Sequence, residues 1–303
     1  MITGTTRVIA HLGWPTEAFR APLIYNPWFE ARGINAVVVP MGVQAPDYPS
    51  VLKALARIAN VHGALVTMPH KVRTLALADE ITPAARIAGA CNALLRRADG
   101  TWLGDQFDGE GFVRGVARKG VRLAGARAFI AGCGGVGSAI AASLAAAGVQ
   151  TLSLFDVKAT SADALRVRLS KHHPTLLART GSSDPASHDI VVNATPLGMH
   201  DGDPLPIDVG RIDDGALVGE VVMKARHTPL VEAALARGLA VQVGTDMLFE
   251  MIPAYLEFFG FGTTTADELR AVARFGEQGN VQAAAAPTRM RTGEHATRQE
   301  PRP

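Results

Sequence analysis

A glycine-rich segment between an apolar stretch and an alanine-rich stretch constrains the fold of this chain most strongly. Residues 128–131 (Ala-Phe-Ile-Ala) predict a buried strand, and residues 138–147 predict a helix. Between them, a glycine loop lets backbone N–H groups approach a pyrophosphate at the positive end of a helix. Its strand–loop–helix context makes the motif specific for a dinucleotide. The loop residues that we expect to bind it are Gly132, Gly134, Gly135, Val136 and Gly137.

An acidic residue follows at the end of the next expected strand. Asp156 comes directly after the apolar run at residues 151–155, about 20 residues beyond the glycine loop, where an acid binds the adenosine ribose. Its carboxylate would repel a 2′-phosphate, which favours NAD over NADP. Lys158 favours the opposite choice, because a nearby cation can hold the extra phosphate. We therefore expect NAD as the cofactor and leave NADP open.

Strand and helix signals alternate along most of the chain, which indicates parallel β-α-β construction. Before the glycine loop, the expected elements are strands at 8–13, 36–40 and 64–67 and helices at 22–32 and 48–62. After it, further strands are expected at 151–155, 190–193 and 217–220. We expect a two-lobed α/β protein with an N-terminal α/β substrate-binding domain and a Rossmann dinucleotide-binding domain. The expected division is a substrate-binding and catalytic domain at 1–109, the Rossmann domain at 110–243, C-terminal helices returning to the substrate domain at 244–276, and a disordered tail at 277–303.

Composition narrows the class of partner. The net charge is only +2, which gives no reason to expect nucleic acid or an anionic membrane surface. No apolar run reaches the ~20 residues that a membrane helix needs. The two cysteines, Cys91 and Cys133, show neither metal-ligand spacing nor a disulfide framework. We expect a cytoplasmic protein with a small-molecule substrate and no metal.

A lysine and an aspartate offer a pair for proton transfer. Lys71 follows the expected strand at 64–67, and the strand ends of open α/β sheets border a ligand crevice. Oxidation of an alcohol requires a group that accepts the hydroxyl proton, and a carboxylate such as Asp108 can orient an amine for this task. Without further information, a solvated surface pair is the alternative interpretation of these two residues.

Seven sequence blocks, in order over about residues 8–275, resemble those of the shikimate dehydrogenase family. The blocks are Val66–Lys71, Gly89–Asn92, Gln106–Gly111, Gly132–Gly137, Asn193–Met199, Thr228–Leu230 and Gly244–Leu248. The resemblance implies that Lys71 gives and takes the proton of the reacting oxygen while Asp108 binds and orients. It further implies that Thr67 and Asn92 bind the substrate. The implied cofactor contacts outside the glycine loop are Asn193, Ala194, Thr195, Gly244 and Met247, although a core position is the alternative for Met247.

Four positions depart from the family in the expected substrate pocket. Two family serines that hold the shikimate carboxylate are Phe19 and Ala21 here, a family tyrosine is Met223, and a family glutamine is Met251. Each lost hydrogen bond to a charged group costs about 1.5–3 kcal/mol, so the losses should weaken shikimate binding by orders of magnitude. Arg20 lies between the lost serines and could hold a carboxylate as a fork, or could point into solvent.

These observations leave three hypotheses. The first is an active NAD(P)-dependent dehydrogenase for shikimate, quinate or a less hydroxylated hydroxy or keto acid. The second is a nucleotide-binding regulatory homologue without turnover. The third, another two-lobed dehydrogenase of the methylene-tetrahydrofolate type, is disfavoured by the blocks at 66–71 and 228–230. A homodimer is also expected, although no feature of the sequence indicates the oligomeric state.

Overall fold

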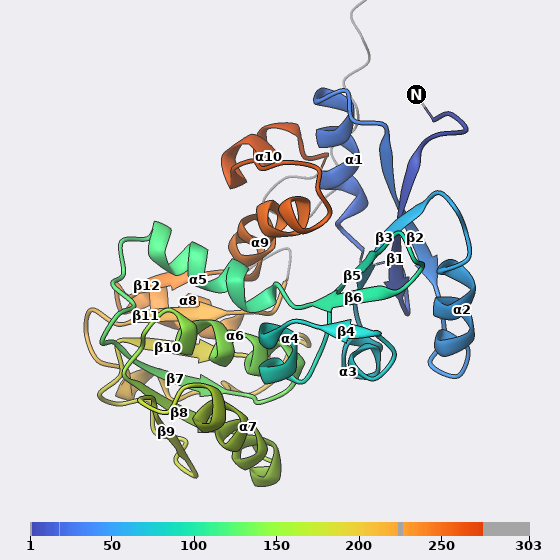
Figure 1. Cartoon of the computed structure of the whole chain (residues 1–303). Coiled ribbons are helices and arrows are strands. Elements are labelled where there is room, and N and C mark those ends of the chain that lie inside the picture. The colour runs from blue at the N-terminus through green and yellow to red at the C-terminus, as the bar shows by residue number, and fades with distance from the viewer. Residues whose placement is uncertain (1, 18, 224–226, 275–303) are drawn as a thin grey trace, which may run out of the picture.

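The computed structural model describes residues 2–17, 19–223 and 227–274, which form two six-stranded sheets (Figure 1). The expected α/β class is confirmed. The expected tail at 277–303 lies outside the described residues. Among the residues described, no helix is both long and apolar enough to cross a bilayer.

The first sheet contains strands from the N-terminal third of the chain in the order β2-β1-β3-β5-β6-β4. Its strands are β1 (Arg7–Gly13), β2 (Ala36–Gly42), β3 (Val61–Val66), β4 (Glu80–Ile81), β5 (Ala93–Arg96) and β6 (Trp102–Asp105). Strand β1 runs parallel to β2 and β3, but β5 is antiparallel to both β3 and β6. The three strands expected in this half of the chain are thus parallel, and the antiparallel strand β5 is one that the sequence did not predict. Residues 97–101 form a tight turn that joins β5 to β6 and is too short for the helical crossover that a parallel pair needs.

Four helices connect these strands. They are α1 (Pro22–Ala31), α2 (Tyr48–Leu55), α3 (Lys71–Leu75) and α4 (Pro83–Ala88). Helix α2 is shorter than the expected helix at 48–62. The chain leaves it through turns at Ile58 and Val61, and the carbonyl of Asn60 already accepts a hydrogen bond from Val8 of β1. Pairing with β1 thus ends the helix before its apolar pattern does.

The second sheet is parallel throughout and has the strand order of a dinucleotide-binding domain, β12-β11-β10-β7-β8-β9. Its strands are β7 (Arg127–Ala131), β8 (Thr151–Phe155), β9 (Leu177–Thr180), β10 (Ile190–Asn193), β11 (Leu217–Glu220) and β12 (Ala240–Gln242). Its connections include helices α6 (Gly135–Ala146), α7 (Ala159–His172), η1 (Val209–Arg211) and α8 (Pro229–Ala236).

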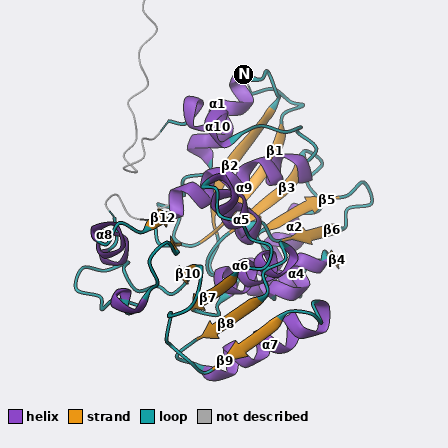
Figure 2. Ribbon diagram, turned by 90° about the vertical axis from the view of Figure 1, so that its left-hand side faces the viewer, coloured by secondary structure: helices purple, strands orange, loops and turns teal. Residues whose placement is uncertain are grey.

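Three further helices are α5 (Asp108–Arg118), α9 (Gly244–Phe258) and α10 (Ala266–Val272). Figure 2 shows α5 and α9 in the middle of the molecule, between the two sheets. Glycines allow this close packing: a Cβ at Gly109 would lie 2.1 Å from the carbonyl oxygen of Ala139 in α6, and one at Gly111 would lie 2.5 Å from Cβ of Met251 in α9. Helix α5 is therefore wedged between α6 and α9.

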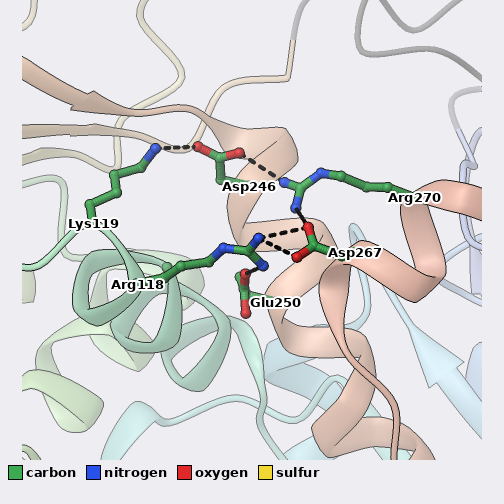
Figure 3. A pocket seen from close by; sticks show the side chains of 7 residues that line it. Arg118, Lys119, Asp246, Glu250, Asp267 and Arg270 are labelled. Carbon is green, nitrogen blue, oxygen red and sulfur yellow. Dashed lines mark hydrogen bonds and ion pairs between the residues drawn. The ribbon is translucent and has the colours of Figure 1, made fainter.

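A charged hollow of about 330 Å³ marks the outer side of this helix contact (Figure 3). Its charged lining residues are Arg118, Lys119, Asp246, Glu250, Asp267 and Arg270. They pair with one another: Arg118 contacts Asp267 at 2.6 Å and Glu250 at 3.1 Å, and Asp246 accepts from both Lys119 and Arg270. The three positive and three negative side chains neutralise each other, and their ion pairs hold α5 and α10 against α9.

Candidate active site

Each sheet has a point where the strand order reverses, and ligands of open α/β sheets bind outside the carboxyl ends of the strands there. In the first sheet this point is β1, which lies between β2 and β3. Gly13 ends β1, and a Cβ there would lie 2.4 Å from Cγ2 of Thr67 and 2.8 Å from Cζ of Phe19. The ends of β1 and β3 thus approach closely, and both expected substrate-binding segments meet at this edge.

Lys71 and Asp108, far apart in the sequence, form a direct ion pair at this edge. The Lys71 Nζ donates to Oδ2 of Asp108 at 2.6 Å, and the side chains are 17% and 4% exposed. Asn92 Nδ2 donates to the other carboxylate oxygen at 2.9 Å, while its own Oδ1 accepts from the backbone N–H of Phe107. The buried carboxylate is therefore fixed on both oxygens, and the lysine amine is its more exposed partner.

The chain positions this cluster through local structure. Lys71 begins α3, which follows β3 after a turn at residues 67–70, and Asp108 begins α5, whose positive end stabilises a carboxylate. The Lys71 carbonyl accepts from the N–H of Cys91, which fixes α3 against the segment that carries Asn92. Tyr255 of α9 donates to the Asn92 carbonyl at 3.4 Å. Helix α9 thus supports the site from the C-terminal end of the fold.

The glycine loop lies at the reversal point of the second sheet, between β7 and β10. Gly132 has φ of +95°, and a Cβ on it would lie 2.6 Å from the carbonyl oxygen of Ala194. A Cβ on Gly137 would lie 1.9 Å from the carbonyl oxygen of Gly132. Gly134 precedes the first turn of α6, which contains Gly135 and Val136, and has open space where a Cβ would be. These features match a cradle for a pyrophosphate at a helix N-terminus.

Asp156 is held beside this loop. One carboxylate oxygen accepts from the N–H of Cys133 at 2.7 Å and the other from the N–H of Lys158 at 2.8 Å. Lys158 is exposed, whereas Asp156 is partly buried. The carboxylate thus faces the loop where the adenosine ribose of a dinucleotide is expected, as the sequence predicts, and no described residue forms an ion pair with it.

A buried glutamate connects the segments that follow β10 and β11, beside the glycine loop. Glu220, at the end of β11, accepts from Nδ2 of Asn193, from the hydroxyl of Thr228 and from the N–H of Val222. Burial is the largest influence on its pKa and raises it. Asn193 Oδ1 in turn accepts from the N–H and hydroxyl of Thr195. Glu220 therefore links the blocks at 193–199 and 228–230.

The segment that replaces the family serines packs on β1. The Phe19 ring stacks on His11 with ring centroids 4.0 Å apart, and Ala21 is buried in the aromatic core. Arg20 is partly buried, and its guanidinium has no hydrogen bond or ion pair with the residues that the structure describes. The serine positions are thus occupied by apolar groups at the edge where Thr67 lies.

The methionines at the other altered positions lie along α9. Met223, 52% exposed, lies against Gly244, where a Cβ would be 2.9 Å from its Cγ. Met251 lies roughly two turns further along and packs on Gly111 in the first turn of α5. Met247 is 7% exposed and belongs to a core cluster. The structure thus brings Met251 to the helix that begins with Asp108 and packs Met247 in the core.

Three residues near these sites carried no prediction of function from the sequence. His11 is a polar residue at a core-facing position of a strand, Glu220 ends an apolar strand, and Gln106 uses Oε1 to accept from the N–H of Asp108. A polar side chain in an otherwise apolar strand is the signal that could have identified the first two. Their partners come from distant segments, however, so the sequence does not reveal them.

Comparison with known proteins identifies the family. Residues 12–94 match the model of the shikimate dehydrogenase substrate binding domain. A shikimate dehydrogenase (NADP(+)) of Acidiphilium cryptum is 34% identical over 275 residues, 90% of this chain and 98% of that protein. The structure of shikimate 5-dehydrogenase from Listeria monocytogenes in complex with shikimate and NAD has a TM-score of 0.82 at 25% identity, over 89% of this chain and 97% of the other. Quinate dehydrogenase from Corynebacterium glutamicum in complex with NAD gives 0.78 at 27%, over 88% and 98%. The predicted resemblance is confirmed, and this chain belongs to the shikimate dehydrogenase family of NAD(P)-dependent oxidoreductases that act on CH–OH groups.

Proposed function

We propose that this protein interconverts a ring hydroxy acid and the corresponding keto acid with NAD, and that its substrate carries fewer hydroxyl groups than shikimate. The observation that carries the proposal is the Lys71–Asp108–Asn92 cluster at the reversal point of the first sheet. The relatives support the reaction type, since their names specify shikimate or quinate dehydrogenase.

In this proposal Lys71 is the proton donor and acceptor. Its side chain is 17% exposed, which supports access of a substrate oxygen to the amine, while Asp108 is held by Asn92 and by the start of α5. In the reducing direction the ammonium gives a proton to the carbonyl oxygen, and in the oxidising direction the amine takes the hydroxyl proton. Asp108 orients the amine for both steps, and Thr67 lies where it can contact the substrate.

The nucleotide crevice fits a dinucleotide on the geometry of its glycines. Side chains at Gly132 or Gly137 would collide with backbone oxygens, whereas Gly134 leaves open space at the start of α6. When bound, the nicotinamide cofactor supplies or accepts the hydride. Asp156 supports NAD, because its carboxylate would repel a 2′-phosphate. NADP remains the second choice, since the Acidiphilium cryptum relative carries that name.

The proposal of a less hydroxylated substrate rests on the altered pocket. Phe19 packs against Gly13 and His11, Ala21 is buried, and Met251 packs on α5. None of these side chains can replace the hydrogen bonds of two serines and a glutamine. Arg20, which has no ion-pair partner among the described residues, is the group that we propose for the substrate carboxylate.

The test is cofactor reduction, followed at 340 nm, with NAD or NADP and a panel of shikimate, quinate and 3-hydroxycyclohex-1-ene-1-carboxylate. We expect turnover of the last compound at a lower KM than shikimate. Lys71→Ala should abolish the signal, while Lys171→Ala, which removes an exposed lysine on α7, should retain it. A signal that survives Lys71→Ala, or a low-millimolar KM for shikimate, would contradict the proposal.

We further propose that the protein acts in the cytoplasm, with a small molecule as its partner. Support comes from Cys91 and Cys133, which are free and buried. A homodimer is the assembly that we propose, and light scattering after size-exclusion chromatography tests it: a mass near 31.8 kDa would mean a monomer.

A further inference from the structure

His11 is a histidine in a strand position where an apolar residue would be expected. Along β1, Ile9 and His11 lie on the same face, and Ile9 packs in the aromatic core beneath α1 and α9. His11 is 8% exposed, and its Nδ1 is completely enclosed without a hydrogen-bond partner. A leucine would fill this position without leaving a polar atom unpaired. The histidine therefore makes the fold less stable than an apolar residue would. This cost indicates that the histidine has a role other than packing.

The position of His11 indicates what uses it. It lies two residues before the end of β1, the strand at which the sheet order reverses, and the crevice outside this strand end is where a ligand binds. Phe19, which stands in the place of a carboxylate-binding serine, covers the His11 ring. Lys71 is close enough for its charge to act on the imidazole. His11 thus contacts the residue at the lost serine position and lies within the electrostatic influence of the proton-transfer group.

We propose that His11 determines substrate specificity, with its imidazole forming a hydrogen bond to a ring oxygen of the substrate while Arg20 holds the carboxylate. This inference rests on the proposed dehydrogenase function and adds a residue that holds the substrate. The Phe19 ring, stacked on the imidazole, forms an apolar surface beside this single polar contact. Such an apolar surface favours a ring with few hydroxyl groups.

The protonation state of His11 fits this role. Burial, together with the positive charge of Lys71, lowers the pKa of His11 to about 4. The imidazole is therefore neutral at pH 7 and offers one donor and one acceptor. A neutral ring can bind a hydroxyl or a carbonyl oxygen without competing with the Lys71 ammonium for a proton.

The experiment compares three variants of the full chain: His11→Leu, His11→Asn and the control His173→Leu. His173, at the end of α7, also has a buried ring nitrogen without a partner but lies in the nucleotide-binding lobe. For His11→Leu we expect an unchanged or higher Tm, a KM for 3-hydroxycyclohex-1-ene-1-carboxylate raised about tenfold, and kcat and NAD affinity within twofold of wild type. His11→Asn should give a KM between those of the wild type and His11→Leu, because its amide can form part of the hydrogen bonding. His173→Leu should have the KM of the wild type.

The outcomes separate this inference from the proposed function. If the wild type turns over a panel acid and His11→Leu keeps its KM, or loses Tm without a change in KM, the role of His11 is structural and the inference is wrong. If the wild type turns over none of the acids, the proposed function fails, and ¹⁵N-histidine NMR of the NADH complex decides on His11. A shift of the His11 ring signals, identified by their loss in His11→Leu, on addition of a panel acid supports the contact, whereas no shift with any acid overturns it.

Discussion

The ion pair between Lys71 and Asp108 should contribute to the free energy of unfolding, separately from any role in proton transfer. Removing one partner of a buried ion pair costs about 3–5 kcal/mol, because the other charge is left uncompensated. Asp108→Asn leaves a lysine that is 17% exposed, so we expect the lower end, about 3 kcal/mol, in the free energy of unfolding. Lys71→Met leaves a carboxylate that keeps its hydrogen bond from Asn92 and the positive end of α5, and we expect about 2 kcal/mol.

The double variant tests the pairing itself. It contains neither charge, so we expect it to lose about 3 kcal/mol in the free energy of unfolding rather than the sum of the two single losses, which corresponds to a coupling energy of about 2 kcal/mol. Urea unfolding of the four proteins without cofactor, followed by circular dichroism, measures this cycle. Single losses that add within about 0.5 kcal/mol would show that the two groups do not interact, and would refute the argument from the 2.6 Å contact.

Three further predictions concern the nucleotide crevice. Gly137→Ala places a Cβ 1.9 Å from the carbonyl oxygen of Gly132, so we expect at least a tenfold loss of NAD affinity by calorimetry; unchanged affinity would contradict the cradle geometry. Asp156→Ser removes the carboxylate that repels a 2′-phosphate, so the ratio of NADP to NAD affinity should rise about tenfold or more, and a constant ratio would place the ribose elsewhere. Glu220 has a raised pKa in the folded state, so the fold binds a proton that the unfolded chain has released. The wild type should therefore lose stability relative to Glu220→Gln as the pH rises from about 4.5 through that raised pKa, and parallel urea-stability curves would contradict this.

The nucleotide-binding half could be predicted from the sequence because its signals are local. Gly132, Gly137 and Asp156 lie close together along the chain, and the strand–loop–helix motif dictates how they meet. In the structure Gly132 and Gly137 approach each other closely, the N–H of Cys133 in the same loop donates to Asp156, and the second sheet has the strand order of a dinucleotide-binding domain. The Lys71–Asp108 contact was also predicted, but only through the family resemblance, because nothing in the spacing of these residues requires them to touch.

The substrate half could be predicted less well because its geometry depends on register between distant segments. The alternation of strands and helices does not reveal that β5 and β6 form an antiparallel hairpin, nor that pairing with β1 ends α2 at Leu55. The environment of His11 follows from the β1 register and from the Phe19 ring, which belongs to a connecting segment. The buried partners of Glu220 likewise come from two separate blocks of sequence.

The core of the first sheet has a consequence for how the chain folds during synthesis. The face of this sheet under α1 is completed by α9 and α10, including a hydrogen bond from Trp28 Nε1 to Thr264 at 3.0 Å and one from the N–H of Arg274 to the Leu23 carbonyl at 2.9 Å. During translation, the first lobe therefore emerges from the ribosome long before the helices α9 and α10, which cover it, are synthesised. Until about residue 274 has emerged, the growing chain must carry an uncovered aromatic surface, whereas the nucleotide-binding lobe can already be compact. A nascent chain stalled just before α9 should accordingly bind chaperones through its oldest residues rather than its newest.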